Sequence, residues 1–155
     1  MQVTKFLLLF FYISCFSINI KKANSKYIFI SNENSDTVSV LNSSDKKIVK
    51  TIKTGGRPRD MKFNNNNTKL YLVVSEENHI AVIDVKKLEI VDYIECGDDP
   101  EIFDISPDGK MIAVSNEDDN ELTIISTKNN KILKRIKNVG VEPEGVNFTT
   151  DGKYI

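Results

Sequence analysis

The chain has 155 residues, of which 40% are hydrophobic and 28% are charged, and its formal net charge at pH 7 is −1. A chain of this length is normally a single domain, and its apolar share is sufficient for a globular core. The near-neutral charge does not provide the basic surface that binds nucleic acid, so we expect no nucleic-acid partner.

Residues 1–25 differ in composition from the rest of the chain. Lys5 precedes the apolar run Phe6–Ile13, and Ala23-Asn24-Ser25 closes the segment. A short basic part, an apolar run of this length and a small-x-small site are the features of a secretory signal peptide, and the run is short for a bilayer span. We therefore predict a signal peptide over residues 1–25, cleavage after Ser25, a periplasmic or secreted location, and no membrane segment after cleavage.

Other interpretations of this segment remain open. It is also compatible with a buried first strand or an uncleaved anchor. Cys15 follows Tyr12-Ile13-Ser14, which is similar to a lipoprotein acylation site, although Tyr12 is the wrong residue type for its position.

Without residues 1–25 the chain keeps one cysteine, Cys96, so it can form no internal disulfide. Export without a disulfide is compatible with a bacterial periplasm or cell surface. We expect Cys96 to be a small residue at a strand end and not a nucleophile, because the one histidine, His79, is distant from it in the sequence.

The remaining chain is an internal repeat. Pro58, Pro100 and Pro143 recur at spacings of 42 and 43 residues. Apolar runs recur at about the same interval, as "TVSVLN" at 37–42, "IAVIDV" at 80–85 and "LTIIST" at 122–127. Each period contains four short runs rich in Ile, Val, Phe and Tyr, separated by Gly, Pro, Asn, Asp and Ser, which is typical of strands and turns.

The turns between runs have a recognisable chemistry. Ser106-Pro107-Asp108-Gly109 suits a type I turn with a left-handed residue after it, and Asp151-Gly152 repeats the pattern. In the first copy Asn64–Asn67 replaces this turn. Since asparagine tolerates positive φ, we predict the same turn there, with one inserted residue.

Four antiparallel strands in about 42 residues are the signature of a β-propeller blade. The absence of tryptophan argues against a WD40 repeat. We predict an all-β partial propeller over residues 26–155, with whole blades at 55–96 and 97–139 and partial blades at 26–54 and 140–155. Because a propeller closes with about 4–8 blades, we expect an incomplete ring, the N-terminal part of a roughly seven-bladed protein of ~320 residues.

The repeat resembles the YVTN family of β-propellers. The resemblance rests on "YIFISNENSDTVSVLN", on "KIVKTIKTGGRPRDMKF" and on the turns "GDDPE" and "GVEPEG". It is most similar to the branch associated with pyrroloquinoline-quinone (PQQ)-dependent catabolism, with departures at Asn64–Asn67, Asp60 and Ile102. This resemblance implies a non-catalytic periplasmic binding or scaffold component of quinoprotein alcohol oxidation, whose partner is a quinoprotein dehydrogenase, a cytochrome or a transporter component.

Alternating loops place the Gly-x-x-Pro loops and the Ser-Asn-Glu loops on one face of the predicted propeller, together with Glu33, Glu76 and His79. We predict a ligand-binding or partner-binding face in which the arginines pair carboxylates; the alternative is a set of solvated loops kept polar for solubility. The residues chosen for this face are Arg57, Arg59, Asp99, Glu101, Glu117, Asp118, Asp119, Glu142 and Glu144.

No catalytic residues, metal site or cofactor are predicted. A single histidine cannot complete a triad or a zinc cluster, and "NEDDNE" at 116–121 offers oxygens for calcium but lacks the spacing of an EF-hand. Two alternative functions remain: a redox-cofactor or hydrolytic propeller enzyme with its active residues in further blades, and a cell-surface adhesion or antigen protein.

Overall fold

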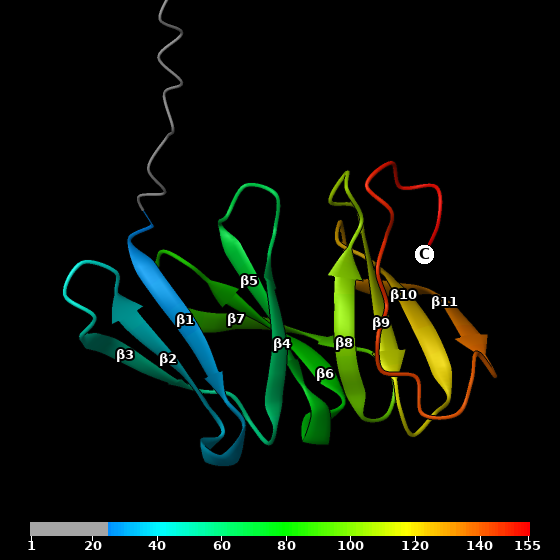
Figure 1. Ribbon diagram of the computed structural model, residues 1–155, viewed down its shortest axis with the longest axis horizontal. Helices are drawn as coiled ribbons and strands as arrows, with labels where there is room; N and C mark the ends of the chain where they lie inside the picture. Colours follow the sequence, from blue (N-terminus) through cyan, green and yellow to red (C-terminus); the bar gives the residue numbers. More distant parts are fainter. Residues whose placement is uncertain (1–24) are drawn as a thin grey trace, which may run out of the picture.

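The computed structural model describes residues 25–155, and Figure 1 shows them as a row of twisted antiparallel sheets. The predicted signal peptide and Cys15 lie outside the described residues. Within residues 25–155 the only helices are two 3-10 turns of three residues, and none could cross a bilayer. The all-β propeller prediction is therefore confirmed.

The strands form one three-stranded sheet and two four-stranded sheets, each with its strands in chain order. The first sheet contains β1 (Tyr27–Asn32), β2 (Thr37–Asn42) and β3 (Ile48–Lys53). The second contains β4 (Pro58–Phe63), β5 (Lys69–Val74), β6 (His79–Asp84) and β7 (Glu89–Glu95). The third contains β8 (Pro100–Ile105), β9 (Met111–Asn116), β10 (Glu121–Ser126) and β11 (Lys131–Lys137).

Alternation along the middle strands explains why the sheets stack. Successive side chains of a strand point to opposite faces. In β5, Leu70 and Leu72 pack against Val38 and Val40 of the first sheet, whereas Tyr71 and Val73 belong to the core shared with the third sheet. The second sheet is thus apolar on both faces, and its middle strands are continuous hydrophobic runs.

A second core forms between the second and third sheets. It contains Phe103 of β8 and Ile112 of β9, which are 0% exposed and pack with Val73, Ile80 and Val82. The outermost strands β3, β7 and β11 are largely exposed. Apolar burial therefore links neighbouring sheets through their inner and middle strands.

The segment after β11 runs along the third sheet but contains no assigned strand (Figure 1, red). Val146 is 8% exposed and packs with Ala113 and Ile124, and the backbone N–H of Phe148 donates a hydrogen bond of 2.8 Å to Asp104. Residues 143–148 thus cover the face that a following blade would cover.

The prediction that Asn64–Asn67 forms the same turn as Ser106–Gly109 is confirmed, but the predicted insertion of one residue is wrong. Asn67 has φ 57° and Gly109 has φ 72°, so asparagine does replace glycine at the left-handed position. However, the two turns are closed by the same hydrogen bond. The Asn67 N–H donates to the Asn64 C=O at 2.9 Å, and the Gly109 N–H donates to the Ser106 C=O at 2.7 Å. The two turns have the same length, and no residue is inserted.

Substitution of Phe103 tests the core between the second and third sheets. Phe103→Ala removes a fully buried ring and should lower the free energy of unfolding in urea by about 3–5 kcal/mol. Ile102→Ala is the matched control, because Ile102 is next to Phe103 in the chain but is 37% exposed. Equal losses for the two variants would contradict this packing.

Candidate functional site

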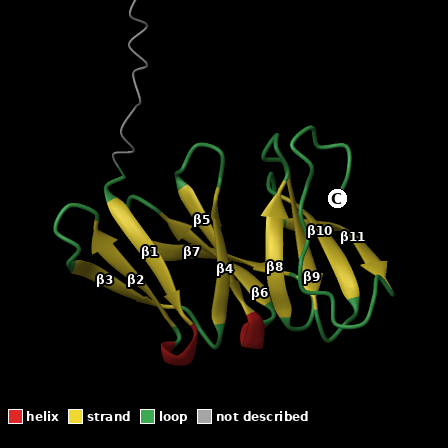
Figure 2. Ribbon diagram, in the orientation of Figure 1, coloured by secondary structure: helices red, strands yellow, loops and turns green. Residues whose placement is uncertain are grey.

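Two groups of loops meet at one edge of the stacked sheets. The 3-10 turns η1 (Glu33–Ser35) and η2 (Ser75–Glu77) lie there, drawn red in Figure 2, beside the loops that enter β4 and β8. Backbone hydrogen bonds join the groups, from Ser75 N–H to Arg57 C=O at 3.1 Å and from Glu117 N–H to Asp99 C=O at 2.9 Å. The predicted loops thus lie together at one edge of the molecule. We call it the acidic edge; it consists of η1, η2 and the loops that enter β4 and β8.

The residues that precede the repeated prolines Pro58, Pro100 and Pro143 share an unusual backbone conformation. Arg57, Asp99 and Glu142 have φ of 54°, 47° and 50°. Left-handed φ is uncommon for residues other than glycine. This geometry turns the chain into the inner strand at each repeat and projects a charged side chain at the acidic edge.

Asparagines hold these strained loops in place. Asn78 and Asn120 are themselves left-handed, with φ of 57° and 52°. The Asn78 side-chain oxygen accepts the Asp99 N–H at 3.0 Å, and the Asn120 oxygen accepts the Glu142 N–H at 3.0 Å. We call this contact the asparagine clamp; the 42-residue spacing of its two asparagines is a sequence signal for it, although neither asparagine is among the predicted site residues.

The two arginines cross from the second sheet to carboxylates on its neighbours. Arg57 Nη1 lies 3.3 Å from Asp99 Oδ1, and Arg57 Nη2 lies 3.7 Å from Glu101 Oε1. Arg59 contacts the other Glu101 oxygen, and both arginines lie 3.7 Å from Glu33 Oε1. The arginines are therefore engaged inside the protein.

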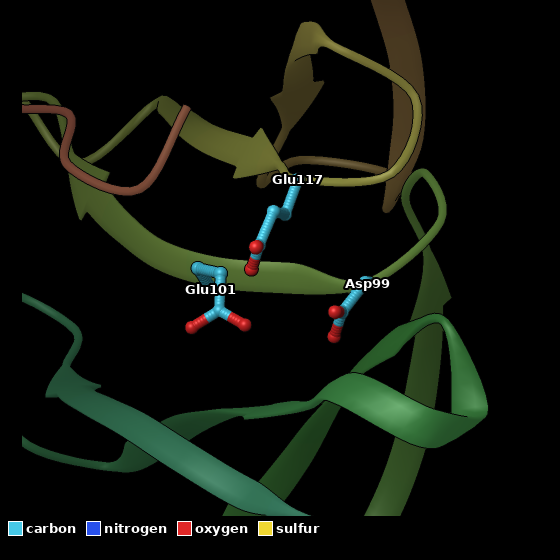
Figure 3. A group of neighbouring side chains, drawn as sticks. All are labelled: Asp99, Glu101 and Glu117. Carbon is cyan, nitrogen blue, oxygen red and sulfur yellow. The ribbon is translucent and has the colours of Figure 1, made fainter. Parts of the chain in front are cut away.

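Three carboxylates converge in this region, as Figure 3 shows for Asp99, Glu101 and Glu117. One oxygen from each lies within 4.8 Å of the others. Glu101 is only 3% exposed, and its Oε1 atom has no hydrogen-bond partner. Glu117 makes no ion pair within residues 25–155, so negative charge is concentrated beside a buried carboxylate.

The structure does not gather all the predicted site residues. Arg57, Arg59, Asp99, Glu101 and Glu117 lie together, whereas Asp118, Asp119, Glu142 and Glu144 are exposed around them. Asp119 instead accepts the Asp98 N–H at 2.9 Å and shapes the loop. Glu33 joins the cluster although it was not among the chosen residues, because its contact depends on how two sheets lie side by side.

A polar groove of 310 Å³ opens on the acidic edge next to the cluster. Arg57 lines it, and its carboxylates come from Glu76, Asp98, Asp99 and Asp118. The groove therefore favours positively charged groups.

His79 and Cys96 show no arrangement for catalysis. The His79 ring meets Tyr93 edge-on at 4.6 Å, and desolvation lowers the pKa of His79, so it is neutral at pH 7. Cys96 is 3% exposed, and burial raises the pKa of its thiol to about 12. A thiol held protonated in this way is unreactive.

Loss of Arg59 tests the internal ion pair. Arg59→Ala leaves the buried Glu101 charge with only the longer Arg57 contact, which should lower the free energy of unfolding by on the order of 3 kcal/mol. Lys110→Ala, which breaks an exposed ion pair with Asp108, should change it very little. A double variant, Arg59→Met with Glu101→Leu, should recover most of the loss in urea unfolding; failure to recover would contradict the ion-pair explanation.

His79 should make stability depend on pH. Its folded pKa lies below its ordinary 6.5, so the unfolded chain takes up the proton more readily. The free energy of unfolding should therefore decrease as pH falls from about 7 through 6.5 and level off below the folded pKa. His79→Phe should abolish this decrease; urea midpoints of both proteins between pH 7.5 and 5 provide the measurement, and parallel curves would contradict it.

Comparisons with known proteins agree with this architecture. The family described as YNCE-like beta-propeller matches residues 15–153. A search of the curated proteins gave no significant match.

Two solved structures are similar to the chain. One is titled Kuenenia stuttgartiensis Hydrazine Synthase, with 25% identity, a TM-score of 0.76, and coverage of 83% of this chain and 37% of that one. The other is titled Dihydro-heme d1 dehydrogenase NirN in complex with DHE, with 14% identity, a TM-score of 0.64, and coverage of 72% and 24%. The chain thus spans well under half of either structure, and the second shows a common fold alone. Since the family match covers most of the sequence, the chain belongs to the YNCE-like β-propeller family.

Proposed function

We propose that this chain is a non-catalytic binding or scaffold propeller of the periplasm, and that it serves PQQ-dependent alcohol catabolism by docking a positively charged protein through the acidic edge. The observation that carries the proposal is the contrast between arginines that are paired with carboxylates and exposed carboxylates that have no ion-pair partner within residues 25–155. Arg57 and Arg59 are occupied by Glu33, Asp99 and Glu101, whereas other carboxylates point to solvent. The exposed ones are Asp36, Glu76, Glu77, Asp98, Asp118, Asp119, Glu142 and Glu144.

The charge distribution supports docking by this edge. The opposite edge carries exposed lysines in its turns, among them Lys46, Lys86, Lys110 and Lys128. Exposed acids such as Glu89 and Asp108 lie among these lysines, but the acidic edge carries the larger share of the negative charge, and such an unequal distribution orients an approaching partner and raises the rate of association. A lysine-rich or arginine-rich surface on a partner would meet the acidic edge and avoid the lysine-bearing one.

The partner class comes from the family resemblance and the predicted signal peptide. Turns similar to those of PQQ-associated propellers support a quinoprotein dehydrogenase, a cytochrome or a transporter component as the partner. The two similar structures carry the names of a synthase and a dehydrogenase. An enzymatic role is the competing proposal, since this chain covers 37% and 24% of those structures.

Affinity capture with charge-reversed variants tests the proposal. The tagged chain, incubated with periplasmic extract of its source organism, should retain a dehydrogenase, cytochrome or transporter component, and high salt should release it. Asp118→Lys should weaken retention at least roughly tenfold, because it adds like charge facing the partner. Glu89→Lys is the matched control, since this exposed residue begins β7 at the opposite edge.

Two outcomes would overturn the proposal. Capture of none of these components would remove the assigned role, and equal retention by the two variants would remove the acidic edge as the docking surface. Haem or quinone absorbance in the purified chain would favour the enzymatic proposal instead.

A further inference from the structure

We infer that Asp99, Glu101 and Glu117 form a binding site for a hard divalent cation, with Ca²⁺ as the best match. This site lies within the acidic edge but is independent of any protein partner. Three observations support it: unbalanced charge, carboxylates that converge, and a buried carboxylate oxygen without a hydrogen bond.

The charges in the cluster do not cancel. The cluster contains four carboxylates, those of Glu33, Asp99, Glu101 and Glu117, but only the two guanidinium groups of Arg57 and Arg59. Two negative charges remain, and Glu117 has no cationic neighbour of its own in the described chain. A divalent cation supplies the missing charge.

The oxygen atoms are distributed so that arginines and a cation can bind together. Asp99 uses Oδ1 for Arg57, and Glu101 uses Oε2 for Arg59, which leaves Asp99 Oδ2 and Glu101 Oε1 available. Glu117 has both oxygens available. The arginines would then remain as neighbours that orient the ligands, and they need not leave.

The spacing of the carboxylates suits one shared ion. Oxygens bound to Ca²⁺ at about 2.3–2.6 Å cannot be more than about 5.2 Å apart. The three ligand atoms lie within 4.8 Å of one another. Small side-chain rotations would bring them onto a single centre.

The Glu101 side chain provides the independent indication of a ligand. It is only 4% exposed, and its Oε1 atom accepts no hydrogen bond, because Arg57 Nη2 is too distant at 3.7 Å. A buried polar atom without a partner is costly and rare. Arg57 lies near both Asp99 Oδ1 and this oxygen, so Oε1 is close to the Asp99 carboxylate, and a cation bound between the two side chains would satisfy it.

The donor set selects the kind of ion. All three donors are carboxylates, and hard oxygen ligands without nitrogen or sulfur favour Ca²⁺ or Mg²⁺ over transition metals. Ca²⁺ accepts irregular geometry with six to eight ligands, whereas Mg²⁺ demands a near-ideal octahedron. A half-open cluster that needs water to complete its shell therefore suits Ca²⁺, with an affinity of about 10⁻⁴–10⁻³ M as in extracellular modules.

Calorimetric titration of the chelator-treated 155-residue chain with CaCl₂ at constant ionic strength tests the inference. The wild-type chain should bind one Ca²⁺ saturably. Glu117→Gln should raise the Kd roughly tenfold or more, since a ligand charge is lost. Glu142→Gln should leave the Kd unchanged, because it removes the same charge from an exposed position outside the cluster.

Circular dichroism establishes that each variant is folded, and Asp99→Asn provides a second ligand variant should Glu117→Gln fail to fold. Absence of saturable binding by the wild-type chain overturns the inference. So does equal weakening by the ligand variants and Glu142→Gln, which would indicate diffuse attraction of cations to the acidic edge. Neither result bears on partner capture, so this site and the proposed function succeed or fail separately.

Discussion

Burial of both faces of the second sheet is the constraint on which the structure depends. In β5, Leu70 and Leu72 enter the core shared with the first sheet, and Tyr71 and Val73 enter the core shared with the third sheet. This double burial fixes the sheets side by side, and their loops then emerge at common edges. The turns η1 and η2 and the loops that enter β4 and β8 therefore bring their charged residues together at the acidic edge.

Charge at the acidic edge has both an internal and an external part. Arg57 and Arg59 link the second sheet to residues on both of its neighbours, Glu33 on one side and Glu101 on the other. Buried ion pairs contribute little net stability when desolvation is included, but they disfavour arrangements that leave a charge unpaired. The pairs are thus better understood as fixing how the sheets align, while the remaining carboxylates stay available for binding.

The sequence was sufficient to predict the repeat and the positions of the strands and turns up to β11, because these depend on local periodicity and on residues such as Asn67 and Gly109, but the residue expected to be inserted at Asn64–Asn67 is not there. It was not sufficient for the cluster. A register shift between Pro100 and Phe103 buries Glu101 and leaves Ile102 37% exposed, the reverse of what hydrophobicity indicates. Glu33 was expected on the same face but not among the site residues, because its contacts to Arg57 and Arg59 depend on the lateral spacing of two sheets. The left-handed φ of Arg57, Asp99 and Glu142 also has no signal in residue type.

The asparagine clamp has a consequence for how such edges diversify. The side-chain oxygens of Asn78 and Asn120 each accept a hydrogen bond from a backbone N–H, a group that every residue except proline possesses. The side chain at the gripped position, aspartate in one repeat and glutamate in the next, can therefore change without loosening the loop. The backbone N–H holds the loop and the side chain provides the charge. The charged group of each repeat can therefore be replaced without a change in the loop structure.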